Sequence, residues 1–301
     1  MVDDSELGIG ERDAALPYSK GLMAQTLMAT GLPPERAYDV AASVEHWLHE
    51  TGGQSISMDE LRPLAERVLG MKEGAALMVR LEQWRRLRYL ERPIIILIGG
   101  TTGVGKSTLA AQLAHRLGVV RVASTDTVRQ VMRAFFSAEL MPAIHFSSFD
   151  CAAAVRFPVP EQTDLSRAGF IEQAKAVAVG VEAVVSRAVQ EKQSTIIEGV
   201  HLVPGFLDRR RWNEAVVIEL VMAVPDARRH RTHFTARDWQ TGGVRPLRKY
   251  VAHFREIRRI QEYILAKARK SGVLVIDNES IDDAVNEAMT EVLRAVGELG
   301  E

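Results

Sequence analysis

A glycine-rich segment between a strand pattern and a helix pattern is the feature that most restricts how this chain can fold. The segment, residues 100–107, follows the pattern G-x-x-x-x-G-K-[ST] in full. A continuous apolar, β-branched run at residues 94–98 precedes it, which is typical of a strand buried on both faces of a sheet. Residues 106–117 follow with helical spacing. Strand, glycine-rich turn and helix in this order predict a phosphate-binding loop, called the P-loop below.

The residue types of the P-loop suit a polyphosphate. Glycines let the backbone come close to the phosphates, and successive N–H groups and a helix N-terminus attract negative charge. Lys106 is expected to reach the β- and γ-phosphates, and the Ser107 hydroxyl to coordinate Mg²⁺. The alternative is a chance glycine-rich turn. The residues predicted to bind ATP are Gly100, Thr101, Thr102, Gly103, Val104, Gly105, Lys106, Ser107 and Thr108.

Strand and helix patterns alternate after Pro93. Further strands are predicted at residues 119–123, 195–197, 215–222 and 273–276, and helices at 106–117, 127–137, 161–192, 246–270 and 281–299. Such alternation implies right-handed crossovers between parallel strands. The expected fold is α/β, a P-loop kinase-type doubly wound parallel sheet of about five strands.

The chain before Pro93 shows helix patterns and no strand pattern. Residues 57–60 read Ser-Met-Asp-Glu, a capping box that begins one of these helices. We therefore predict a small all-helical domain at residues 1–92 and a P-loop kinase domain at residues 93–301.

Composition excludes several classes of protein. With 38 Lys and Arg against 39 Asp and Glu, the net charge is −1, so the chain as a whole has no positive field that would attract nucleic acid. Local basic patches remain an alternative. The single cysteine, Cys151, has no internal disulfide partner, and no Cys/His spacing indicates zinc. The longest apolar run is too short to cross a bilayer, and the acidic start lacks the pattern of a signal peptide. We expect a cytoplasmic protein.

Two acids follow predicted strands, where ligands gather in parallel sheets. Asp126 is expected to accept the proton of an attacking hydroxyl or to hold Mg²⁺, and the alternative is an N-cap for the next helix. Glu198 ends an apolar strand pattern and resembles the carboxylate that orders Mg²⁺ in nucleotide-binding sheets. A surface acid is the alternative there.

An arginine-rich segment near residues 226–245 is predicted to form a lid over the transferred phosphate. Phosphoryl transfer spreads negative charge over the phosphate oxygens, so that cations near the site stabilise the transition state. Arg231 and Arg237 are the arginines expected to face the site, and a solvated helix face is the alternative.

The stretch 140–150 combines hydroxyls, a histidine and aromatics without helical or strand spacing. Together with Arg129 it suits a small anionic acceptor. The predicted acceptor residues are Arg129, His145, Ser147, Ser148 and His201. Two alternatives remain: an ordinary loop for residues 140–150, and a structural histidine at position 201.

These segments together resemble the 2-phosphoglycerate kinase family. The resemblance lies in residues 98–108, in Ser124-Thr125-Asp126 with Arg129, in residues 140–148, in Glu198-Gly199-Val200-His201 and the residues up to Gly205, in residues 250–263, and in residues 275–278. It implies ATP-dependent phosphorylation of the 3-hydroxyl of 2-phosphoglycerate, giving 2,3-bisphosphoglycerate and ADP. It also implies that residues 1–92 are similar to the ATP-cone, a regulatory nucleotide-binding module.

In the expected mechanism, Asp126 activates the acceptor hydroxyl while Arg129 and the serines hold the acceptor anion. Closure of the lid excludes water, so that transfer is favoured over hydrolysis. Three rival functions stay open: a kinase of a nucleoside, sugar or sugar phosphate, a nucleotide-dependent ATPase switch, and a nucleic-acid end kinase.

Overall fold

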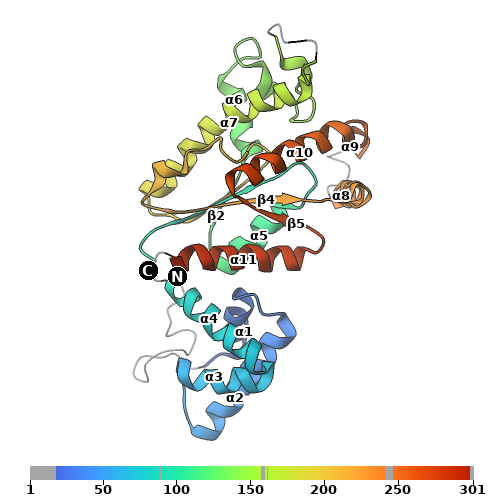
Figure 1. The fold of residues 1–301 in the computed structure, drawn as a ribbon. Helices are drawn as coiled ribbons and strands as arrows, with labels where there is room; N and C mark the ends of the chain where they lie inside the picture. The colour runs from blue at the N-terminus through green and yellow to red at the C-terminus, as the bar shows by residue number, and fades with distance from the viewer. Residues whose placement is uncertain (1–17, 89, 157–159, 161, 241–246, 299–301) are drawn as a thin grey trace. The chain divides into compact units, whose positions relative to one another are not determined.

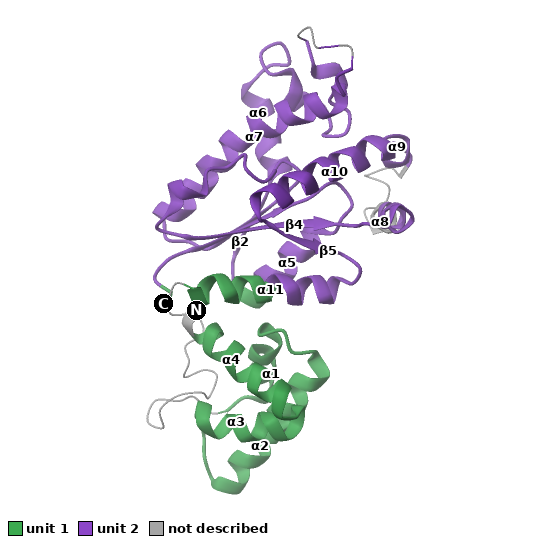
Figure 2. Ribbon diagram, viewed as in Figure 1, with its two compact units in different colours: residues 1–90, 116–118, 289–301 green, residues 91–115, 119–288 purple. Residues whose placement is uncertain are grey.

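The computed structural model describes residues 18–88, 90–156, 160, 162–240 and 247–298. It divides into two compact units (Figure 2). Of the described residues, one unit contains those up to Leu90, residues 116–118, and those from Met289 onward, and the second unit contains residues 91–115 and 119–288. Among the helices in these ranges, none is long and apolar enough to cross a membrane.

The first unit is built on four helices: α1 (Lys20–Ala29), α2 (Pro34–Thr51), α3 (Met58–Leu69) and α4 (Met71–Arg88). Local signals set their ends. Pro34 opens α2, and Gly52 ends it with a left-handed φ of 68°. The predicted capping box of α3 is confirmed, because Ser57 and Glu60 each accept from the other's backbone N–H. Buried side chains from all four helices, among them Met23, Val40, Leu61 and Leu81, form the core of this unit.

The second unit contains one parallel sheet of five strands in the order β2-β3-β1-β4-β5. The strands are β1 (Ile94–Gly99), β2 (Arg121–Ser124), β3 (Thr195–Glu198), β4 (Val216–Ala223) and β5 (Leu274–Asp277). The predicted α/β fold with a five-stranded parallel sheet is confirmed. Central β1 is buried at all six positions because it pairs with β3 and β4 and both faces of the sheet are covered.

The edge strand β2 differs most from its prediction. The strand expected at 119–123 begins at Arg121, which pairs with Thr195, and ends at Ser124. Val120 is 91% exposed before it. The expected strand therefore starts two residues before the segment that pairs with β3.

The helices of the second unit lie on both faces of the sheet, with α7 and α10 on one face and α5 on the other (Figure 1). The helices that lie wholly or in part in this unit are α5 (Lys106–Leu117), α6 (Thr125–Phe135), α7 (Leu165–Gln190), α8 (Ala227–Gln240), α9 (Leu247–Ala252), α10 (Phe254–Ser271) and α11 (Ile281–Gly297), with short 3₁₀ turns at Pro142–His145, Ala152–Ala154 and Arg209–Trp212. Residues 116–117 of α5 and 289–297 of α11 belong to the first unit. One helix expected at 246–270 is in fact two, because His253 between α9 and α10 has a non-helical ψ of 21°. The last five residues of the expected lid, 241–245, lie outside the described residues.

The buried centre of the sheet predicts a contrast between two truncations. Ile96→Ala in β1 removes a fully buried side chain and is expected to lower the free energy of unfolding by about 2–5 kcal/mol. Val122→Ala on the edge strand, where the side chain is 47% exposed, is expected to cost less than about 1 kcal/mol. Denaturant unfolding followed by circular dichroism measures both, and equal losses would contradict the assignment of β1 as the buried centre.

Candidate active site

The P-loop connects β1 to α5 and is closely surrounded by protein. Gly103 has a left-handed φ of 86°, and a Cβ at this residue would lie 2.4 Å from a ring carbon of Phe234 in α8. Gly105 has φ of 93°, and its Cβ would lie 2.4 Å from Nδ2 of Asn278. Glycine is therefore required here for the backbone conformation and also for the close approach of protein groups.

The two side chains at the end of the loop that were predicted to contact phosphate and Mg²⁺ differ in burial. Lys106 is buried, and its Nζ donates to the carbonyl oxygen of Thr101 at 2.8 Å. Ser107 is exposed, and its hydroxyl donates to Oε1 of Glu198 at 2.9 Å. Thr108 is also exposed, on the first turn of α5, whereas the Thr101 hydroxyl is buried and donates to the carbonyl of Ile257 at 3.3 Å.

Sheet register brings Glu198 to this loop. Glu198 pairs with Ile98 of β1, two residues before the first P-loop glycine. A carboxylate and a hydroxyl so close together are hard oxygen ligands of the kind that Mg²⁺ takes alongside phosphate oxygens and water. In the described parts of the chain there is no group of three or more His, Cys, Asp or Glu side chains that would hold a metal ion without such help.

Asp126 lies at the same edge of the sheet. Ser124 of β2 pairs with Glu198 of β3, and Asp126 is two residues beyond Ser124 in the first turn of α6. The N-cap interpretation of Asp126 is wrong, because Ser124 caps the helix by accepting from the N–H of Thr127 at 3.0 Å. The Asp126 side chain is instead 62% exposed, with its Oδ1 3.5 Å from Nε of Arg129.

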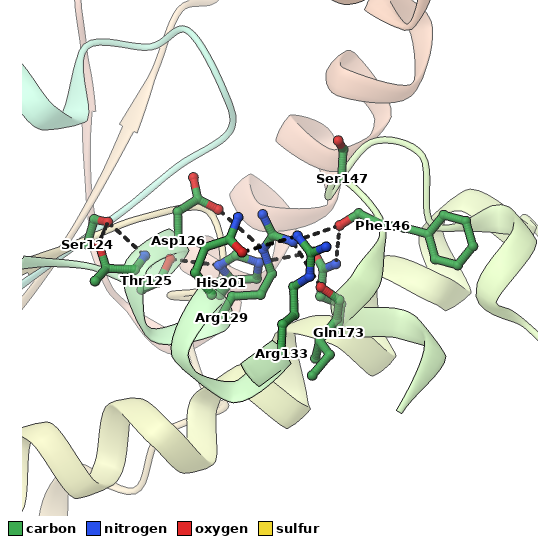
Figure 3. Close-up of polar contacts among 12 residues, drawn as sticks. Ser124, Thr125, Asp126, Arg129, Arg133, Phe146, Ser147, Gln173 and His201 are labelled. Atoms are coloured by element: carbon green, nitrogen blue, oxygen red, sulfur yellow. Dashed lines mark hydrogen bonds and ion pairs between the residues drawn. The ribbon is translucent and has the colours of Figure 1, made fainter. Parts of the chain in front are cut away.

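Arg129 connects this carboxylate to the predicted acceptor segment (Figure 3). Its side chain is only 12% exposed, and one guanidinium nitrogen donates to the carbonyls of Ile144 and Phe146 at 2.9 and 3.1 Å. Gln173 of α7 donates to the same Phe146 carbonyl at 3.0 Å. One guanidinium nitrogen of Arg129 is thus committed to backbone carbonyls, and the residue braces the segment that follows.

The remaining predicted acceptor residues lie on that segment or beside it. His145 is half-buried, with Nε2 2.9 Å from the carbonyl of Phe136. Ser148 is half-buried, and Ser147 accepts at its hydroxyl from the ammonium of Lys249 at 3.0 Å. Lys249 is a cation on α9 that sequence reasoning missed. Its ammonium also lies 5.6 Å from the ring centre of Phe149.

The position of His201 favours the structural alternative over direct contact with substrate. The ring is 1% exposed, with Nδ1 2.7 Å from Oγ1 of Thr125 and Nε2 3.0 Å from Oε1 of Gln173. Burial lowers the pKa of His201 well below 6.5, despite the nearby charge of Asp126, so that the ring is neutral. His201 therefore links the start of α6 to α7 beneath the exposed Asp126.

Helix α8, which contains most of the predicted lid, contacts the P-loop through histidines. His230 Nε2 lies 2.8 Å from the carbonyl oxygen of Thr102, and His233 Nδ1 lies 2.9 Å from that of Gly103. Arg231, predicted to face the site, is exposed and lies over the ring of Phe254 at 4.5 Å. The side chain of Arg237 falls outside the described residues. Spacing of three residues, which places both histidines on one helix face, is the signal that sequence reasoning missed.

The amino-acid sequence is similar to those of several curated proteins. The chain is 38% identical over 287 residues to 2-phosphoglycerate kinase of Methanothermobacter thermautotrophicus, covering 94% of each protein. It is 37% identical over 303 residues to 2-phosphoglycerate kinase of Thermococcus kodakarensis, covering 100% of this chain and 99% of the relative. For 2-phosphoglycerate kinase of Methanopyrus kandleri the identity is 36% over 284 residues, covering 94% of this chain and 86% of the relative.

Among solved structures, a gluconokinase from Sinorhizobium meliloti matches 69% of this chain and 95% of its own, with a TM-score of 0.40 and 15% identity. No family model matches the chain. Identity above one third, sustained over almost the entire length of several archaeal relatives, establishes that the chain belongs to the 2-phosphoglycerate kinase family.

Proposed function

We propose that this protein is an ATP- and Mg²⁺-dependent kinase that phosphorylates the 3-hydroxyl of 2-phosphoglycerate, with 2,3-bisphosphoglycerate and ADP as products. The observation that carries the proposal is the meeting of three strand ends: the P-loop after β1, Glu198 at the end of β3 and Asp126 just beyond β2. The names of the relatives supply the acceptor.

On the nucleotide side, the backbone of the P-loop and the side chain of Lys106 bind the triphosphate. The buried ammonium of Lys106 brings a positive charge that neutralises the phosphates. Ser107 and Glu198, whose side-chain oxygens are 2.9 Å apart, would hold Mg²⁺. Asp126, at the same edge of the sheet, would be a further oxygen ligand. When bound, the metal neutralises charge on the transferred phosphoryl group and helps to orient it.

On the acceptor side, the exposed carboxylate of Asp126 takes the proton of the 3-hydroxyl as that oxygen attacks. Arg129 holds this carboxylate and the 144–146 segment in one arrangement. Ser147 and Lys249 then present a hydroxyl and an ammonium, which suit the phosphate and carboxylate of 2-phosphoglycerate. Lys249 supplies the exposed charge that sequence reasoning had assigned to Arg129.

The choice of acceptor is tested by phosphate transfer from ATP to a panel of small hydroxyl compounds. We expect 2-phosphoglycerate to be used in preference to nucleosides, sugars and sugar phosphates, because its two anionic groups match the charge near Ser147. Transfer to another compound and none to 2-phosphoglycerate would reject the acceptor. If the protein hydrolyses ATP and no acceptor accelerates the hydrolysis, the proposed kinase activity is rejected and the alternative of a nucleotide-dependent ATPase switch is supported.

Asp126→Asn keeps the shape of the side chain and removes its basicity. We expect kcat to fall by about 10²- to 10⁴-fold, with a small change in the KM for ATP, because general base catalysis contributes that much. Asp208→Asn, which changes an exposed acid paired with Arg210, is the matched control. Steady-state kinetics give the result. Unchanged turnover in Asp126→Asn, combined with loss of activity in Lys106→Ala, would contradict the proton transfer to Asp126.

Lys249→Met removes the ammonium and keeps a flexible side chain. We expect the KM for 2-phosphoglycerate to rise about tenfold or more, since a charge-assisted hydrogen bond contributes about 1.5–3 kcal/mol, and the KM for ATP to stay the same. Lys270→Met, at the exposed end of α10, serves as the control. An equal rise in both KM values, or no rise, would argue against an acceptor role for Lys249.

A further inference from the structure

Four consecutive carbonyl groups of the P-loop each accept a hydrogen bond from a side chain. The donors come from three parts of the fold. Lys106 Nζ binds the carbonyl of Thr101 at 2.8 Å, His230 Nε2 that of Thr102 at 2.8 Å, His233 Nδ1 that of Gly103 at 2.9 Å, and Asn278 Nδ2 that of Val104 at 3.0 Å.

Hydrogen bonds that fix these carbonyls also fix the directions of the neighbouring N–H groups, because the peptide unit is planar. In a planar trans peptide the C=O and the N–H of the next residue point in opposite directions. Fixing the carbonyls of residues 101–104 therefore aims the N–H groups of residues 102–105 to the other side of each peptide plane. Residues 102 and 103 form a turn, and within the described residues the N–H groups of Thr102, Gly103 and Gly105 donate to no backbone carbonyl. Successive N–H donors of this kind make a binding site for an anion.

The His230 imidazole is held in a tautomer that donates to the carbonyl of Thr102. A carbonyl oxygen only accepts, so the proton of His230 must be on Nε2. Burial lowers the pKa of His230 to about 4, which keeps the ring neutral at pH 7. Its ring stacks on Phe234 with centroids 5.2 Å apart and meets the edge of Phe254 at 5.6 Å. These contacts fix the direction of the donated hydrogen bond.

We propose that His230, His233 and Asn278 are positioning residues that hold the P-loop peptides so that their N–H groups are ready for the triphosphate before the nucleotide arrives. This inference rests on the proposed binding of ATP at the P-loop. It assigns a second role to the lid helix α8, which fixes the outer side of the loop through two histidines while its arginines had been expected to meet the phosphates.

These positioning residues differ in their action from the ones that bind phosphate directly. Lys106 meets the ligand with its own charge, whereas the two histidines and Asn278 act through the backbone. Pre-orienting the donors lowers the cost of ordering the loop when the ligand binds. Their loss should therefore weaken the affinity for the phosphate tail and leave the binding of the acceptor unaffected.

His233 offers the sharpest experiment because it is half-buried, so that a substitution there disturbs the core less than one at the fully buried His230. His233→Leu removes the donor, whereas His233→Asn puts an amide nitrogen near the place of Nδ1. His230→Leu and His230→Gln form the same pair for a donor at Nε2. His115→Leu, an exposed histidine on α5, is the matched control. Titration calorimetry measures the affinity for Mg²⁺-ATP and for inorganic pyrophosphate, and kinetics give both KM values.

We expect each leucine variant to bind Mg²⁺-ATP and pyrophosphate about three- to tenfold more weakly, since one neutral hydrogen bond is removed. The KM for ATP rises and that for 2-phosphoglycerate does not, and the asparagine and glutamine variants recover most of the affinity. Asn278→Ala, on β5's side of the loop, should show the same pattern independently.

Two results would overturn the inference. One is wild-type affinity for both probes in His233→Leu and Asn278→Ala. The other is an equal rise of the two KM values without recovery in His233→Asn, which indicates a general loss of structure. Failure of the unaltered protein to bind Mg²⁺-ATP would be a different outcome, because it rejects the proposed function itself together with the inference that rests on it.

Discussion

The parallel register of three neighbouring strands is the constraint on which the rest of this site depends. Because β2, β3 and β1 run in the same direction, their carboxyl ends meet at one edge. The register pairs Ile98 with Glu198 and Ser124 with Glu198, so that the P-loop, a carboxylate and the start of α6 become neighbours. An antiparallel neighbour would point its carboxyl end to the opposite edge and separate these groups. The chemistry of a phosphoryl donor and a hydroxyl acceptor in one place follows from strand direction first.

Around that edge, buried polar residues keep exposed ones in place. His201 is neutral, buried and bonded at both ring nitrogens, and it supports Thr125 directly before the exposed Asp126. Arg129 does the same for the 144–146 segment. The P-loop is held from its outer side in the same manner. The orientation of an exposed group such as Asp126 therefore comes from buried residues that are themselves hydrogen-bonded inside the protein.

Much of this could be predicted, and the failures have physical causes. The P-loop, the five strands and the capping box at Ser57 are local patterns in which spacing alone carries the information. The alternative that Asp126 caps α6 is wrong because serine at 124 is also a good cap, and which residue caps the helix depends on where β2 stops pairing. Arg129 looks like a ligand-binding cation in sequence, since nothing local shows that carbonyls of a later segment will use its donors.

By itself, the sequence determined the order of strands and helices, the phosphate-binding loop, and the residue types able to perform phosphoryl transfer, because these follow from hydrophobic spacing and backbone preferences over short distances. Only the tertiary structure decided which polar groups meet. Lys249 reaches Ser147 across 102 positions, and Asn278 reaches the P-loop carbonyl of Val104 across 174. The physical reason is that a hydrogen bond needs two atoms about 3 Å apart, and such proximity between distant segments exists only after the sheet and its helices have packed.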